Sequence, residues 1–175
     1  YYPSGIRLDN AAGLLARMIR ELQATYAPAS LQLVGHSMGG VVAREAVNQL
    51  SDHGDARFLN RLVTLSAPFG GLETAELGVE FAPAVVPSWR DLAPKSAFLE
   101  SLADPLPEGV PHVLFFTIGG PRINVGNSDG VVSLASQLRP EIQDQAEAVI
   151  GVDASHVGIL SDERALRRLV EALTR

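Results

Sequence analysis

The feature that most constrains this chain is a tight serine turn, G-H-S-M-G at residues 35–39, set between two apolar segments. Residues 31–34 are typical of a short buried strand, and residues 41–50 are typical of a helix. Such a turn is expected to need glycine two residues before and two residues after Ser37, because side chains there would collide with neighbouring backbone. We therefore predict that Ser37 stands on a sharp strand-to-helix turn, with its hydroxyl above the carboxyl ends of the strands. The alternative is a glycine-rich turn that contains a serine by chance.

The rest of the chain alternates between strand-like and helix-like segments. Apolar spacing predicts an amphipathic helix over residues 8–26, with Asp9 or Asn10 near its start and Pro28 after its end, and a last helix from about Ser161. Three more apolar runs predict strands: 61–65, 113–118 and 148–152. Alternation of this kind favours the α/β class, with a mostly parallel sheet and helices on both faces. A chain of 175 residues has room for one such domain.

The stretch 69–109 interrupts this alternation. It is roughly 40 residues long, rich in proline and alanine, and too long for a plain loop, so we interpret it as an inserted cap. An apolar run at 77–89 includes Phe81 and Trp89. These side chains could line an acyl pocket or a lid, or they could simply pack the cap onto the sheet. Either way the run favours an apolar acyl group over a charged substrate.

A serine nucleophile needs a general base, and the chain has four histidines. His36 is adjacent to the serine in the turn and is expected to point away from it. His53 lies in a helix-end loop, and His112 opens a strand. His156 follows the last predicted strand and so lies near the carboxyl edge of the sheet. We therefore predict that His156 is the base.

The base needs a carboxylate to orient it, and in this kind of site the acid comes between the serine and the histidine. Asp129 is the one acidic residue between Pro111 and Pro140, in the loop expected after the third strand. Its alternative role is that of a turn-forming aspartate. Asp153 is the rival acid, but it shares a short loop with His156, which favours a role in capping or solvating that loop.

Composition excludes several other functions. The net charge of −6 argues against nucleic acid or an anionic membrane as a main partner, and the absence of cysteine excludes disulfides, thiolate metal sites and cysteine nucleophiles. Asp129 and Asp153 do not have the spacing of a metal-ligand set, so no metal and no cofactor is expected. No membrane-spanning run or signal segment is present in these residues, which leaves localisation open.

The motifs together resemble the α/β-hydrolases of the lipase and esterase type. The similarity rests on five segments, in which Phe69 replaces the usual histidine of the third: 1–5, 33–44, 63–71, 128–132 and 155–158. The resemblance implies that Ser37, Asp129 and His156 form a catalytic triad that hydrolyses carboxylic esters of small-molecule substrates, in contact with a lipid interface in some members. Acyl transfer or thioester hydrolysis by the same acyl-enzyme is the alternative, and a non-catalytic binding relative is another.

The resemblance also implies how the oxyanion would be bound. The backbone N–H of Met38 is the expected first donor. The second donor of such enzymes follows an earlier strand, for which these residues contain no counterpart. We therefore expect that the chain covers the C-terminal two-thirds of the fold, that another segment or a second chain completes the sheet, and that residues 31–34 form an exposed edge. A shortened fold with a different donor, and a poorly active fragment, are the alternatives.

Overall fold

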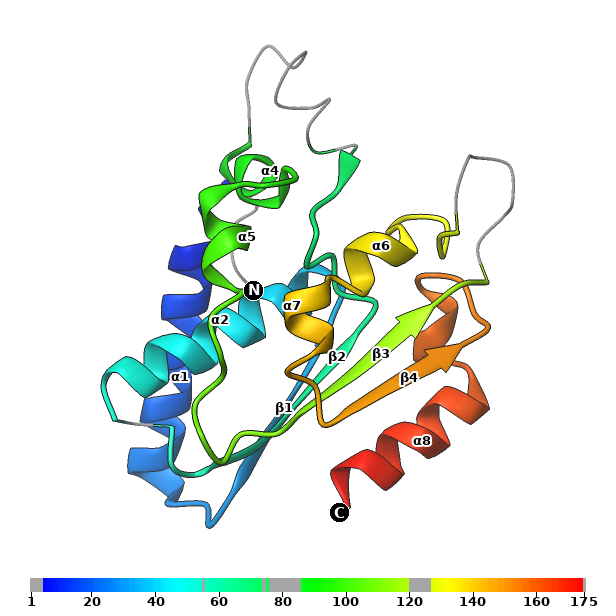
Figure 1. Cartoon of the computed structure of the whole chain (residues 1–175). Coiled ribbons are helices and arrows are strands. Elements are labelled where there is room, and N and C mark those ends of the chain that lie inside the picture. The colour runs from blue at the N-terminus through cyan, green and yellow to red at the C-terminus, as the bar shows by residue number, and fades with distance from the viewer. Residues whose placement is uncertain (1–4, 55, 74, 76–85, 120–126, 175) are drawn as a thin grey trace.

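The computed structural model describes residues 5–54, 56–73, 75, 86–119 and 127–174 (Figure 1). Four parallel strands form one sheet in the order β1-β2-β3-β4: β1 (Leu31–His36), β2 (Leu59–Leu65), β3 (His112–Thr117) and β4 (Ala148–Val152). The helices around the sheet are α1 (Leu8–Tyr26), α2 (Met38–Asp52), α4 (Pro87–Leu92), α5 (Ala97–Ser101), α6 (Leu134–Gln137), α7 (Pro140–Gln143), the 3₁₀ turn η1 (Gly158–Leu160) and α8 (Glu163–Leu173). The predicted α/β class is confirmed.

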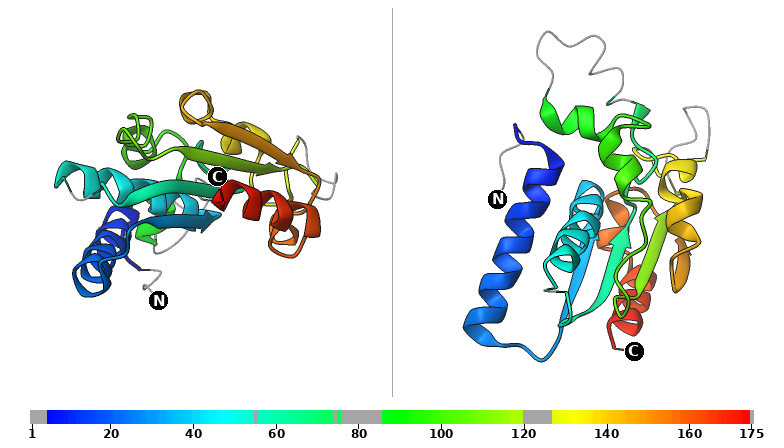
Figure 2. Two further views of the ribbon diagram at one scale, coloured as in Figure 1. Left: turned by 90° about the horizontal axis from the view of Figure 1, so that it is seen from below. Right: turned by 60° about the vertical axis from the view of Figure 1, so that its left-hand side comes forward.

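Helices cover both faces of the sheet, and the strands supply apolar side chains to each. Leu62 and Leu114 belong to the larger core, together with the buried faces of α1 and α2. Val63 and Phe115, the next residues along the same strands, belong to a second core against Ala165 of α8. Successive strand residues point to opposite faces, so α8 lies across the sheet from α1 and α2. In the right-hand view of Figure 2, β1 and β2 lie between α1 and α8.

The N-terminus of α1 is held by a residue from outside the helix. Asp9 lies in the first turn, as predicted, but the capping position is Arg7, whose side chain makes no cap hydrogen bond. Instead the backbone N–H of Leu8 donates to Asp91 Oδ2 of α4 across 2.7 Å, in a buried position. A free N–H at a helix start is thus satisfied by a residue 83 positions away, which no local pattern could have indicated.

The described part of the predicted cap packs onto the main core. Phe98, Leu99 and Leu102 are buried in the same cluster as α1 and α2. The fully buried Arg44 of α2 donates from Nε to the carbonyl of Leu102 across 2.8 Å. These contacts fix α5 beside the helix that follows Ser37. They favour a packing role for these residues of the segment, and the cap interpretation itself stays a prediction.

His112, the first residue of β3, is a buried core histidine. Its side chain is 1% exposed, its Nε2 lies 2.8 Å from Thr64 Oγ1, and the ring edge of Phe69 packs beside it. Burial, with a smaller contribution from the charge of Arg44, lowers the pKa of His112 from 6.5 to about 3. The imidazole is therefore neutral in the folded protein.

This burial predicts a stability loss in acid. The unfolded chain binds a proton at His112 below pH 6.5 and the folded chain does so only near pH 3, so folding loses about 1.4 kcal/mol per pH unit between these values. Other titrating groups also change the free energy of unfolding with pH. The contribution of His112 is the difference between the natural protein and His112→Gln. Urea unfolding across that range is expected to give a flatter curve for the variant. Parallel curves would contradict the assignment.

Candidate active site

Ser37 occupies a strained turn between β1 and α2. Its backbone angles are φ 54° and ψ −132°, a conformation that residues with a Cβ rarely adopt. The Ser37 N–H donates to the carbonyl of Leu65 at the end of β2 across 2.8 Å, and the Ser37 carbonyl accepts from Gly40 N–H across 2.9 Å. α2 begins at Met38, so the Met38 N–H is among those that lack an acceptor within the helix. The geometry that the serine motif predicts is present.

The steric reason for the two motif glycines holds at only one of them. A Cβ at Gly35 would lie 2.6 Å from the backbone oxygen of Gly39 and 2.6 Å from Cα of Gly40. A Cβ at Gly39 would meet nothing within 4 Å, so the expected collision there is wrong. The second close approach belongs to Gly40, whose Cβ would lie 2.8 Å from Cβ of Ala67. This contact lets α2 pack closely on the sheet.

Paired substitutions separate these positions. Gly35→Ala forces backbone apart and is expected to lower the free energy of unfolding by about 3 kcal/mol or more. Gly39→Ala places a methyl group in open space on a helix and should stay within about 1 kcal/mol of the natural protein. Urea unfolding of both variants measures the difference. Equal losses would show that both glycines are required by packing.

The structure brings Ser37, His156 and Asp129 into one hydrogen-bonded row. His156 Nε2 lies 2.8 Å from Ser37 Oγ, and His156 Nδ1 lies 2.8 Å from Asp129 Oδ2. His156 comes from the loop after β4 and Asp129 from the loop after β3, so parallel strands carry all three to the same edge of the sheet. An ionised Asp129 can only accept, so Nδ1 carries the proton and Nε2 is free to accept from Ser37.

Asp129 both forms a turn and faces His156, two roles that the sequence had left as alternatives. Its Oδ1 accepts from the backbone N–H groups of Val131 (3.0 Å) and Val132 (2.8 Å) and so forms a turn, while Oδ2 faces His156. The carboxyl is 1% exposed. Burial raises its pKa, but hydrogen bonds from His156, Thr117 and the two valine N–H groups outweigh burial and leave the pKa below its ordinary value. The rival acid, Asp153, is exposed.

The loop of His156 is held by its backbone as well. His156 N–H donates to the carbonyl of Asp129 across 3.0 Å, and the His156 carbonyl lies 2.8 Å from Nε2 of His36. The ring centroids of His36 and His156 lie 4.8 Å apart, and the ring planes are inclined by 44°. His36 thus braces His156. The motif predicted only that His36 points away from Ser37, and it carries no signal for this contact with His156.

Trp89 and Phe81 were the predicted substrate-binding residues. Trp89 lies on α4 with its side chain 40% exposed, and Phe81 lies outside the described residues, so their role in substrate binding stays a prediction. Over the described ranges, no group of three or more acidic, histidine or cysteine side chains could hold a metal. Over the same ranges, no helix is long and apolar enough to cross a membrane.

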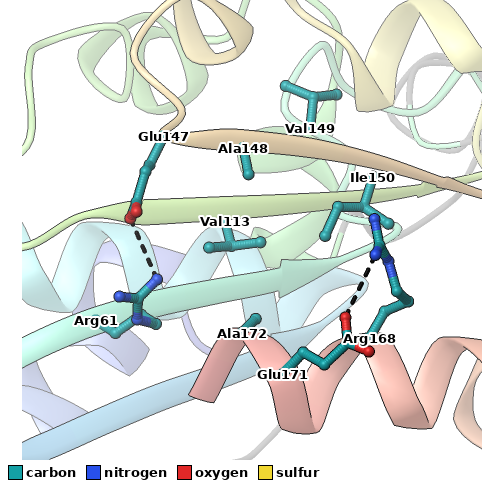
Figure 3. A pocket seen from close by; sticks show the side chains of 9 residues that line it. All are labelled: Arg61, Val113, Glu147, Ala148, Val149, Ile150, Arg168, Glu171 and Ala172. Atoms are coloured by element: carbon teal, nitrogen blue, oxygen red, sulfur yellow. Dashed lines mark hydrogen bonds and ion pairs between the residues drawn. The ribbon is translucent and has the colours of Figure 1, made fainter. Parts of the chain in front are cut away.

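A separate hollow of about 160 Å³ lies between α8 and the strands, lined by residues that include Val113, Ala148 and Ile150 (Figure 3). Two ion pairs border it: Arg61–Glu147 at 3.2 Å and Arg168–Glu171 at 3.3 Å. It includes the first residues of β4, whereas His156 follows the last, so it is distinct from the serine site. The four charged side chains that line this hollow are those of the two ion pairs.

Comparison with known proteins agrees with this geometry. Residues 3–153 match the family described as PGAP1-like alpha/beta domain. The chain belongs to this family. The matched range contains Ser37 and Asp129 and ends just before His156.

This PGAP1-like domain is similar to longer curated proteins named GPI inositol-deacylase. It is 35% identical to the one from Aspergillus fumigatus over 65% of this chain and 9% of that protein, and 29% identical to the one from Emericella nidulans over 83% and 12%. The chain therefore spans about a tenth of the length of these relatives.

A solved structure establishes the fold of the PGAP1-like domain. The mature lipase BlEst2 of Bacillus licheniformis superposes with a TM-score of 0.73 at 18% identity, over 95% of this chain and 74% of that one. The fold is that of the α/β-hydrolases, as the sequence resemblance had predicted. Family and fold together describe a PGAP1-like domain with a lipase-like α/β-hydrolase fold.

Proposed function

We propose that this PGAP1-like domain cleaves carboxylic esters through a Ser37–His156–Asp129 triad and an acyl-enzyme intermediate. The observation that carries the proposal is the row of two 2.8 Å contacts that links Ser37 Oγ to His156 and His156 to a buried, ionised Asp129. A nucleophile, a base and an orienting acid within hydrogen-bond reach of one another are the requirements for activating a serine hydroxyl.

The proposed reaction follows from the roles of these groups. His156 Nε2 accepts the hydroxyl proton of Ser37 as Oγ attacks the acyl carbon. Asp129 stabilises the imidazolium that forms, and His156 then returns the proton to the leaving alcohol oxygen. The N–H of Met38, at the start of α2, faces the developing oxyanion. Water, deprotonated by His156, attacks the acyl-enzyme and releases the carboxylic acid and free Ser37.

We propose an acylated inositol of a GPI lipid as the substrate class, on the basis of the relatives named GPI inositol-deacylase. Removal of an acyl group from an inositol hydroxyl is an ester hydrolysis, which agrees with the proposed site. Exposed apolar residues flank that site and support contact with a lipid interface: Ile118 after β3, Val131 beside Asp129 and Val157 beside His156 are 47%, 55% and 66% exposed.

We propose that the second oxyanion donor comes from polypeptide that pairs with β1. In the described sheet β1 pairs only with β2, on one side, and the side chain of Val34 on β1 is 46% exposed. Open N–H and C=O groups of this kind accept a further strand. Loss of one oxyanion donor costs about 10²–10³ in turnover, so the domain alone is expected to be a slow enzyme.

The experiment offers the protein acyl-inositol lipid, p-nitrophenyl esters of increasing chain length and acyl thioesters of the same lengths, with and without an added acceptor alcohol. Ester hydrolysis predicts release of free fatty acid that is independent of the acceptor. Product that appears mainly as a new ester would favour the alternative, an acyltransferase, and turnover confined to thioesters would favour a thioesterase. If no substrate yields a free or transferred acyl group, and a longer protein that includes the polypeptide pairing with β1 yields none either, the result favours a non-catalytic relative.

A further inference from the structure

Two buried hydroxyls, those of Thr117 and Ser66, extend the hydrogen-bonded row beyond Asp129. Thr117 is the last residue of β3, and its Oγ1 lies 2.6 Å from Asp129 Oδ2. Ser66 directly follows β2, and its Oγ lies 2.8 Å from Thr117 Oγ1. Both residues are 0% exposed. The oxygen that Thr117 contacts is the same one that faces His156 Nδ1.

Hydrogen-bonding capacity fixes the direction of this row. The ionised carboxylate of Asp129 can only accept, so the Thr117 hydroxyl donates to it. The Thr117 oxygen then accepts from the Ser66 hydroxyl. The row therefore runs from Ser66 through Thr117 to Asp129. With the two N–H groups on Oδ1, both carboxylate oxygens are fully engaged, and the carboxylate cannot rotate without breaking several bonds.

The backbone of Ser66 is shaped for this contact. Its φ is 51°, which is strained for a buried residue that carries a Cβ, and its N–H is held by the carbonyl of Phe115 across 3.0 Å. Glycine would adopt this conformation at lower cost but would supply no hydroxyl. The turn after β2 thus brings a hydroxyl to Thr117 at the expense of backbone strain.

Gln137 fixes the distance between β3 and the Asp129 turn. The Thr117 N–H donates to Gln137 Oε1 across 2.8 Å, and Gln137 Nε2 donates to the carbonyls of Thr117 (3.0 Å) and Val132 (3.1 Å). Gln137 is 1% exposed. Because Val132 belongs to the turn that Asp129 forms, this amide joins the end of β3 to that turn.

We infer that Ser66 and Thr117 are positioning residues that hold Asp129 Oδ2 on His156. The inference rests on the proposed function. Charge-assisted hydrogen bonds in a buried site are strong, and cooperative rows strengthen them further. Loss of the Thr117 hydroxyl would leave Oδ2 with His156 alone and let the imidazole drift from the line to Ser37.

The test compares Thr117→Val, which keeps the shape but removes the hydroxyl, with Thr117→Ser, which keeps the hydroxyl. Hydrolysis of p-nitrophenyl butyrate is measured for both, for Ser66→Ala and for the double variant. Thr117→Val is expected to lower kcat about tenfold with KM unchanged, and Thr117→Ser is expected to retain kcat. Ser66→Ala should have a smaller effect, and the double variant should match Thr117→Val because Ser66 acts through Thr117.

A second readout does not depend on turnover. The Nδ1 proton of His156, observed by NMR in the free protein, is expected to lose its strong downfield shift in Thr117→Val and to keep it in Thr117→Ser. If the natural protein hydrolyses no ester, the proposed function fails, and this resonance still tests the positioning role. If Thr117→Val does not fold, Ser66→Ala serves in its place. In Ser66→Ala the resonance of the His156 Nδ1 proton is expected to move upfield by a smaller amount. Equal behaviour of Thr117→Val and Thr117→Ser, or an unchanged resonance in Ser66→Ala and Thr117→Val, would overturn the inference.

Discussion

Ser37→Ala is expected to lower kcat for ester hydrolysis by about 10⁶-fold, because Ser37 is the proposed nucleophile and neither His156 nor Asp129 replaces it in forming the acyl-enzyme. Stability should hardly change. Alanine carries the same Cβ as serine in the strained turn, and the Ser37 hydroxyl contacts His156 at a partly buried position. Initial rates with a p-nitrophenyl ester, and urea unfolding of the same preparations, give the two numbers.

Ser161→Ala is the matched control, since Ser161 is exposed and lies outside the row. It is expected to keep full activity. A Ser37→Ala protein that retained a tenth or more of the natural rate would show that the observed hydrolysis has another origin, and the proposed mechanism would then be wrong.

Asp129→Asn is expected to lower kcat by about 10⁴-fold while the turn survives. Asparagine Oδ1 can still accept from the N–H groups of Val131 and Val132, which directs its NH₂ group at His156. Nδ1 of His156 must then accept, so the ring proton moves to Nε2 and faces Ser37 Oγ. An imidazole in this tautomer cannot remove the hydroxyl proton.

The contrast with Asp129→Ala makes this prediction specific. Alanine removes the turn bonds as well, so it is expected to lower the free energy of unfolding by more than asparagine does. Kinetics and urea unfolding of both variants separate the two roles of Asp129. If Asp129→Asn kept natural activity, His156 would not depend on Asp129 for its tautomer.

The elements that the sequence predicted best are those encoded locally. Residues 8–26 and 148–152 have the bounds of α1 and β4, because apolar spacing and Pro28 act within a few residues. The row of Ser37, Asp129 and His156 was predictable for a second reason. The carboxyl ends of parallel strands lie at one edge of the sheet, so the loops that follow β1, β3 and β4 gather there and bring these residues within reach of one another.

What the sequence could not predict depends on distant partners or on side-chain direction. Asp91 satisfies the start of α1 from 83 residues away, and His36 turns its ring onto His156. The collision expected at Gly39 was wrong, because a Cβ there meets nothing within 4 Å once α2 is packed on the sheet. Thr117 looks like an ordinary strand residue until the Asp129 loop is placed beside it.

Whether Ser37 is an activated nucleophile can be measured with a serine-directed fluorophosphonate, followed by peptide mass mapping, with Ser37→Ala as the control. We expect one adduct, on Ser37, that forms in the natural protein and is absent from the variant. No labelling of Ser37, or equal labelling of the natural protein and the variant, would contradict it.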